Sequence, residues 1–162
     1  MNIFKFFPLI FIAVAFLNYF LLKSKVKKYS DQNEELKAGY DKLLKGFLIF
    51  SVCPWIIVVL GDLTGSTNGI FDYFHPRSLN PFVLTFHFCL MVIFSLTIYW
   101  IYFKNGADFL SKHPGLIQFQ GFGGSKDITS TLSIKIFFAI SLLGGIAALI
   151  MMWFIDFPNF PK

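Results

Sequence analysis

Hydrophobic residues in this chain fall into four long, nearly uninterrupted runs. A helix that crosses about 30 Å of hydrocarbon needs about 20 mainly apolar residues, and residues 3–22, 43–61, 82–103 and 134–155 reach that length. Barrel strands would be about half as long and would alternate polar and apolar positions, so these runs favour helices. The sequence therefore predicts an all-α integral membrane protein, a four-transmembrane-helix bundle that forms one membrane domain over residues 1–162.

The composition agrees with the membrane class. Hydrophobic residues make up 56% of the chain and charged residues only 14%, whereas about a quarter of the residues in a soluble domain are charged. The first run is longer than the hydrophobic region of a usual signal peptide, and the Ala-x-Ala sequence at 13–15 lies inside it. We therefore expect it to be an uncleaved span.

Basic residues are distributed unevenly between the two sides of the predicted membrane domain. Eleven lie in or at the edges of loops 23–42 and 104–131, and three lie on the other side. The eleven are Lys23, Lys25, Lys27, Lys28, Lys37, Lys42, Lys45, Lys104, Lys112, Lys126 and Lys135; the three are Lys5, Arg77 and Lys162. Short cytoplasmic loops carry an excess of lysine and arginine. The sequence thus predicts an N-out/C-out orientation with an external loop over 62–81, in a multi-pass protein of the bacterial inner membrane.

The same charge bias indicates which partners to expect. Lysines beside the spans attract anionic lipid headgroups. Outside the spans there is no basic stripe with interleaved aromatic residues, so nucleic-acid binding is not expected. The partners predicted are membrane lipids together with other membrane subunits or further copies of this chain.

The first predicted cytoplasmic loop has apolar-type positions at steps of three and four residues. These positions are Val26, Tyr29, Asn33, Leu36, Tyr40 and Leu43. This spacing is typical of a coiled coil or a helical hairpin. One interpretation is that extensions of the first two spans pack on each other; the other is a docking surface for a partner helix.

Two polar residues are expected deep within spans, Asn18 and His87. An ionisable group inside a span is a functional hypothesis by default. The simpler role for His87 is a hydrogen bond to a neighbouring helix; the alternative is proton or ion handling. A haem between helices would need a second histidine on a facing span, whereas His75 and His113 lie in loops on opposite sides, so no cofactor is expected.

The predicted external loop holds the densest polar group, Asp62, Asp72, His75 and Arg77, and Asp156 ends the fourth run. Such groups at a membrane edge suit an ion site, an anionic ligand or a proton relay. The simpler interpretation is that one aspartate pairs with Arg77 and pins the loop. The Asp72-x-x-His75 spacing is too common to indicate a metal, so no metal site is expected.

The two cysteines, Cys53 and Cys89, do not form a Cys-x-x-Cys motif. We place Cys53 about seven residues from the inner edge of its span and Cys89 about seven residues from the outer edge of its own. Their depths in the membrane then differ by several ångströms. That separation disfavours a disulfide and predicts free, buried thiols. Pro54 should kink the second span.

The fourth run carries small residues four apart, Ser141 with Gly145 and Gly144 with Ala148. Such pairs allow close approach of helix backbones in lipid. With no catalytic motif recognised, we expect a non-enzymatic protein that is an accessory or structural subunit or another protein-binding membrane component. The alternatives are a homo-oligomeric channel or small-solute transporter, an immunity-type protein that shields the membrane from a toxin, and an enzyme that acts on lipid through the external loop.

Overall fold

The computed structural model describes residues 6–31, 34–121 and 124–155 and is all-α apart from one short hairpin. Four of its helices are long and apolar enough to cross a membrane. They are α1 (Phe7–Ser30), α2 (Glu34–Leu63), α3 (Pro81–Ile98) with its π-helical continuation η4 (Tyr99–Phe103), and α5 (Thr131–Phe154). Their number and positions agree with the four predicted runs. Asn33, Asp156, Lys5 and Lys162 lie outside the described residues.

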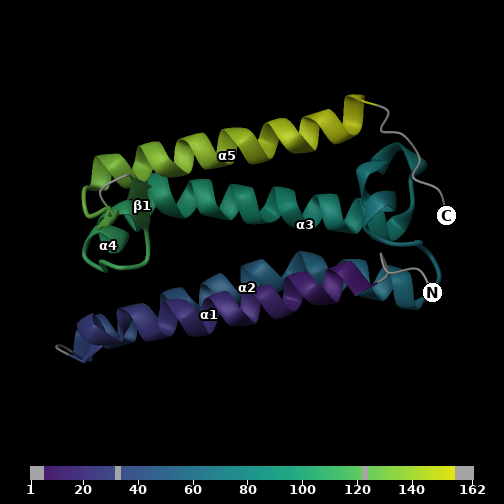
Figure 1. Cartoon of the computed structure of the whole chain (residues 1–162). Helices are drawn as coiled ribbons and strands as arrows, with labels where there is room; N and C mark the ends of the chain where they lie inside the picture. Colours follow the sequence, from purple (N-terminus) through teal and green to yellow (C-terminus); the bar gives the residue numbers. More distant parts are fainter. Residues whose placement is uncertain (1–5, 32–33, 122–123, 156–162) are drawn as a thin grey trace.

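The four long helices run side by side with unequal contact between neighbours (Figure 1). α1 and α2 make the most extensive contact, and α2 and α3 the next. The backbone of α5, by contrast, approaches the rest of the chain mainly at its two ends, near α4 (Gly106–Ser111) and η4 at one end and near η3 (Pro76–Ser78) at the other. The side chains between α3 and α5 must therefore fill a wider gap than those between α1 and α2.

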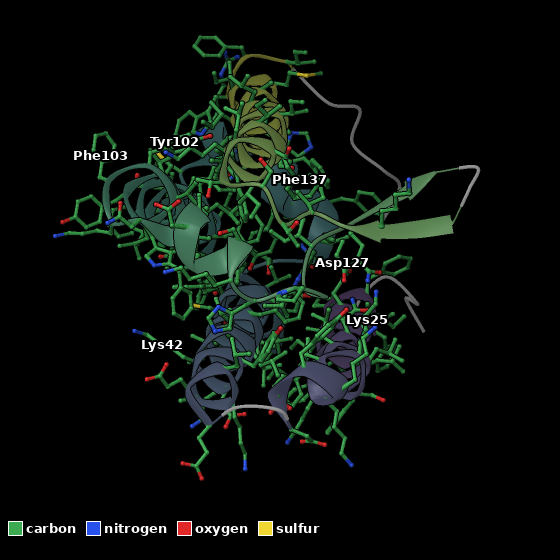
Figure 2. All side chains as sticks on the ribbon, turned by 90° about the vertical axis from the view of Figure 1, so that its left-hand side faces the viewer. Lys25, Lys42, Tyr102, Phe103, Asp127 and Phe137 are labelled. Atoms are coloured by element: carbon green, nitrogen blue, oxygen red, sulfur yellow. The ribbon has the colours of Figure 1, made fainter. Side chains whose placement is uncertain are left out.

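We call the end of the molecule that carries the start of α2 the basic end, because the segments that contain the eleven lysines identified above meet there (Figure 1). Figure 2 looks at this end and labels Lys25 and Lys42. The lysine-containing segments 23–30 and 34–45 continue α1 and α2 as helix rather than forming a loop. Val26, Tyr40 and Leu44 are buried between them, with Tyr29 and Leu36 packed around. Of the two interpretations of this segment, helical extensions that pack on each other are confirmed.

The segment between η4 and α5, which falls within the predicted loop 104–131, contains a short helix and a hairpin. The chain turns at Asn105, whose φ of 56° is left-handed, a region in which asparagine is enriched. Gly106 follows, where a Cβ would come within 2.6 Å of the Trp100 ring. After α4 the chain forms an antiparallel hairpin of β1 (Gln118–Gly121) and β2 (Gly124–Asp127).

The opposite end of the molecule, the loop end, is formed by the connection from α2 to α3. It contains η2 (Ile70–Phe74) and η3 and packs on a small core of Val58, Tyr73 and Val83. Asn80 begins α3, since its side chain accepts a hydrogen bond from the Phe82 N–H at 2.9 Å. This connection fixes how α2 and α3 are aligned along their lengths.

Candidate functional site

The two aspartates of the loop end bind the loop's own backbone and hydroxyl groups. One Asp62 oxygen accepts hydrogen bonds from the Thr67 hydroxyl at 2.7 Å and from the Gly69 N–H at 2.9 Å. Asp72 accepts from the Asn68 N–H at 2.8 Å. Both carboxylates therefore hold the loop in shape. The second oxygen of Asp62 is buried and has no hydrogen-bond partner among the described residues.

Tyr73 links this loop to both adjoining helices. Its hydroxyl is buried and donates to the carbonyl of Ile57 on α2 at 3.3 Å. Burial, which disfavours the charged phenolate, raises the pKa of Tyr73. The tyrosine's backbone carbonyl accepts a hydrogen bond from Nε2–H of His87, on α3, at 2.9 Å.

His87 lies in the interior, with 1% of its surface exposed. Its ring meets Trp153 of α5 edge to face, with 5.9 Å between centroids. A carbonyl only accepts hydrogen bonds, so Nε2 carries a proton and donates it to this bond. Nδ1 is buried without a hydrogen-bond partner in the part of the chain described. The expected hydrogen bond is present, but its partner is the loop backbone at Tyr73 rather than a neighbouring helix.

A cavity of about 340 Å³ lies between α3 and α5, where the two helix backbones are apart. His87 and Ser95 are the polar residues among those that line it, and Phe94, Trp153 and Phe154 are among its apolar walls. The cavity is mostly apolar and partly open to the surface, with the buried His87 on its wall.

The remaining members of the predicted external group are His75 and Arg77, which lie two positions apart where η2 meets η3. The guanidinium of Arg77 lies over the Phe154 ring, 6.0 Å from its centroid, and so joins η3 to the end of α5. His75 is half-buried between η2 and η3. The pairing of Arg77 with Asp62 or Asp72 stays a prediction. Among the described residues no group of three or more histidine, cysteine, aspartate or glutamate side chains is arranged to hold a metal ion.

Asn18, the second polar residue expected at depth, is exposed on α1. His87, by contrast, is buried between α3, the Tyr73 backbone and α5. The single chain thus does not bring these two side chains into one interior path.

The expectation of free thiols is confirmed, whereas the expected separation of the two cysteines and their expected burial are wrong. The sulfur atoms of Cys53 on α2 and Cys89 on α3 lie 3.6 Å apart, and both residues are free thiols. Cys53 is exposed rather than buried, and Cys89 is half-buried. Cys53 stands ten residues before Leu63 and Cys89 eight residues after Pro81, or about 15 and 12 Å from the shared loop end at 1.5 Å per residue. The two predicted depths were counted from opposite edges of the membrane. The connection from α2 to α3 instead places both cysteines at a similar distance from the loop end.

The burial of His113 at the basic end was not predicted from the sequence. His113, which follows α4, has 6% of its surface exposed, and its Nδ1 is 2.6 Å from the Phe109 carbonyl. It packs against α2 at Gly39, where a Cβ would come within 1.9 Å of the histidine Nε2. The neighbouring Tyr40 hydroxyl donates to the Pro114 carbonyl at 2.7 Å. The glycine in a lysine-rich helix was the one available signal for this close approach.

A second contact at the basic end joins α1 to the hairpin. The hydroxyl of Tyr29 donates to Asp127 at 2.8 Å, and Figure 2 shows Asp127 on the side of the hairpin toward the helix that carries Lys25. The amide of Gln118, then the Tyr29 hydroxyl and the nearby lysines Lys28 and Lys25, hold the pKa of Asp127 below its usual value. The contact therefore favours the charged carboxylate.

The small residues of α5 are divided between two faces. Gly145 packs against α3, since a Cβ there would come within 2.7 Å of the Phe94 ring. A Cβ on Gly144 would have no other described side chain or backbone atom within 4 Å, and Ser141 and Ala148 are exposed beside it. One glycine thus serves the contact within the chain, and the other three small residues form an outer face of α5.

Comparison of the chain with protein-family models, with curated proteins and with solved structures finds no match. The function is therefore argued from the geometry itself. The features that bear on it are the outer face of α5, the buried His87 beside the cavity, and the segregation of lysines at the basic end.

Proposed function

We propose that this chain is a non-enzymatic, multi-pass protein of the bacterial inner membrane, and that it acts as an accessory or structural subunit by binding a transmembrane helix of a partner protein. In this proposal α1, α2, α3 with η4, and α5 are the four spans. The basic end faces the cytoplasm, and both termini lie outside it.

The distribution of charge supports this orientation. The basic end contains eleven lysines, whereas the described residues of the loop end contain Arg77. Cytoplasmic flanks of spans carry the excess of lysine and arginine, and the basic end would also meet the anionic headgroups of the inner leaflet.

The single observation that carries the docking proposal is the outer face of α5, formed by Ser141, Gly144 and Ala148. Of the residues in the most apolar 18-residue stretch of α5, 6% are buried within the chain, against 17% in α2 and 17% in α3 with η4. In lipid there is no hydrophobic driving force between helices, so association depends on close packing, which small residues permit. No described atom lies within 4 Å of a Cβ at Gly144, and the small residues on either side of it are exposed. This part of α5 offers such a surface to a partner helix.

Gly144→Leu tests the proposal, with Gly46→Leu as the matched control. Gly46 lies on α2, and a Cβ there likewise has no described atom within 4 Å, so neither substitution places its Cβ against the folded chain. The experiment is the mass and protein composition of the particle extracted gently from the native membrane. We expect stoichiometric foreign subunits with the wild type and with Gly46→Leu, and their loss with Gly144→Leu. Foreign subunits that persist in Gly144→Leu, or a wild-type particle without them, would overturn the proposal.

The homo-oligomeric channel or small-solute transporter is kept as a second candidate because of His87. An interior histidine with an unpartnered Nδ1 on the wall of a cavity is suited to proton or ion handling. It requires a particle made of this chain alone and ion flux in liposomes that His87→Ala abolishes; equal flux in the variant would remove His87 from the path. An immunity-type role shares the protein-binding surface and is distinguished by toxin sensitivity of a deletion strain.

A further inference from the structure

Two thiols from different helices meet at one point of the molecule. Cys53 of α2 and Cys89 of α3 are 36 positions apart in sequence, and their sulfur atoms are 3.6 Å apart. Cys53 is exposed on the surface of the helix pair, so a molecule dissolved in the surrounding membrane reaches it directly. We infer that these cysteines are a modification site, a reversible disulfide that joins α2 to α3 inside the membrane.

The geometry needs only a small adjustment. A disulfide requires sulfur atoms about 2.05 Å apart, so the pair must close by about 1.5 Å. A partial rotation of either side chain about its Cα–Cβ bond moves the sulfur by that much. The loop end already holds the two cysteines at similar depth.

The location of the pair gives the disulfide a structural consequence. Pro54 follows Cys53 within α2, and its buried ring leaves the carbonyl of residue 50 without its helical N–H partner. Helices bend most readily where that hydrogen bond is missing. A covalent link to α3 next to this position fixes the angle between the loop-end half of α2 and α3, whereas the dithiol form leaves the angle free to change.

The chemistry balances with an oxidant of the quinone class. Two S–H bonds break and one S–S bond forms; the two protons and two electrons pass to a lipid-soluble quinone, which becomes a hydroquinone. The starting thiols and the final disulfide are both neutral, so neither state leaves a charge in hydrocarbon. The position of the pair in hydrocarbon depends on the proposed topology, whereas the contact of the sulfurs does not.

The test uses the purified full chain in phospholipid vesicles without oxygen, with and without a short-chain benzoquinone. Free thiols are alkylated, and intact mass and linked peptides are measured for the wild type, Cys53→Ser and Cys89→Ser. We expect quinone to remove both alkylatable thiols of the wild type. The mass should fall by that of two hydrogen atoms, a 53–89 linked peptide should appear, and one hydroquinone should form per disulfide. Dithiothreitol should restore both thiols, and each single variant should keep its remaining thiol.

Three results would overturn the inference. They are a wild type that keeps both thiols in the presence of quinone, a disulfide that links two chains, and the same thiol loss without quinone. The wild-type measurement is decisive even if a serine variant fails to fold. Since the subunit proposal is judged from particle composition, the two can fail separately.

Discussion

Replacing Gly39 by alanine should destabilise the fold, although alanine is the better helix former. The new Cβ would lie 1.9 Å from Nε2 of His113 and 2.8 and 2.9 Å from two of its ring carbons, so the whole ring must move. The ring is held in place by the hydrogen bond to the Phe109 carbonyl, by the Phe109 ring 4.3 Å away and by the Tyr40 ring 5.0 Å away. A displacement of the ring therefore disturbs at least one of these contacts.

The magnitude follows from three contributions to the free energy of unfolding. Overpacking a filled site costs about 1–3 kcal/mol, and loss of the His113 hydrogen bond costs about 1 kcal/mol. The gain in helix propensity from glycine to alanine offsets about 1 kcal/mol of this. We therefore expect Gly39→Ala to lower the free energy of unfolding by about 1–3 kcal/mol.

Gly46→Ala is the matched control, because it lies two turns further along the same helix with nothing within 4 Å of its Cβ. It should be neutral or stabilising by up to about 1 kcal/mol. Both variants would be unfolded by sodium dodecyl sulfate in mixed micelles, with the fluorescence of the three tryptophans as the signal. Equal stability of Gly39→Ala and Gly46→Ala would refute the close approach of α2 and His113.

Two further predictions concern the carboxylates. Asp62→Ala removes the acceptor for Gly69 N–H and for Thr67, which is 1% exposed, so the same titration should show a loss of about 2–3 kcal/mol; an unchanged value would rule out this role. Because folding lowers the pKa of Asp127 below 3.8, its stabilising effect is complete above that pH and is lost as pH falls through the folded pKa. Tyr29→Phe should raise that pKa toward 3.8, as followed by NMR titration of the carboxyl group; a pKa that does not rise would contradict the Tyr29 contact.

The four long helices were predictable because length and hydropathy alone determine them. The helical extensions at the basic end were also predictable, since Val26, Tyr29, Leu36 and Tyr40 repeat at helical steps and then pack as that spacing requires. In both cases the relevant information lies within a short stretch of sequence.

The features that were missed depend on pairs of residues far apart in the chain. The meeting of Cys53 and Cys89 follows from the alignment set by the loop end, not from hydropathy at either cysteine. The hairpin over 118–127 is short and polar, and part of its support comes from Tyr29, 98 positions away. Likewise, the burial of His113 depends on the absence of a side chain at Gly39. Spacing within one segment carries no signal for such contacts.

The contacts at the basic end also set an order of events during synthesis. The α1–α2 hairpin is complete at Leu63, but the carboxylate that receives the Tyr29 hydrogen bond is at position 127. At about 5–20 residues per second, the ribosome needs about 3–13 s to deliver that partner. Throughout this interval Gly39 and Tyr29 lack the His113 ring and the Asp127 carboxylate that they contact in the finished protein. The nascent chain thus presents to insertion factors and chaperones a surface that the finished protein no longer has.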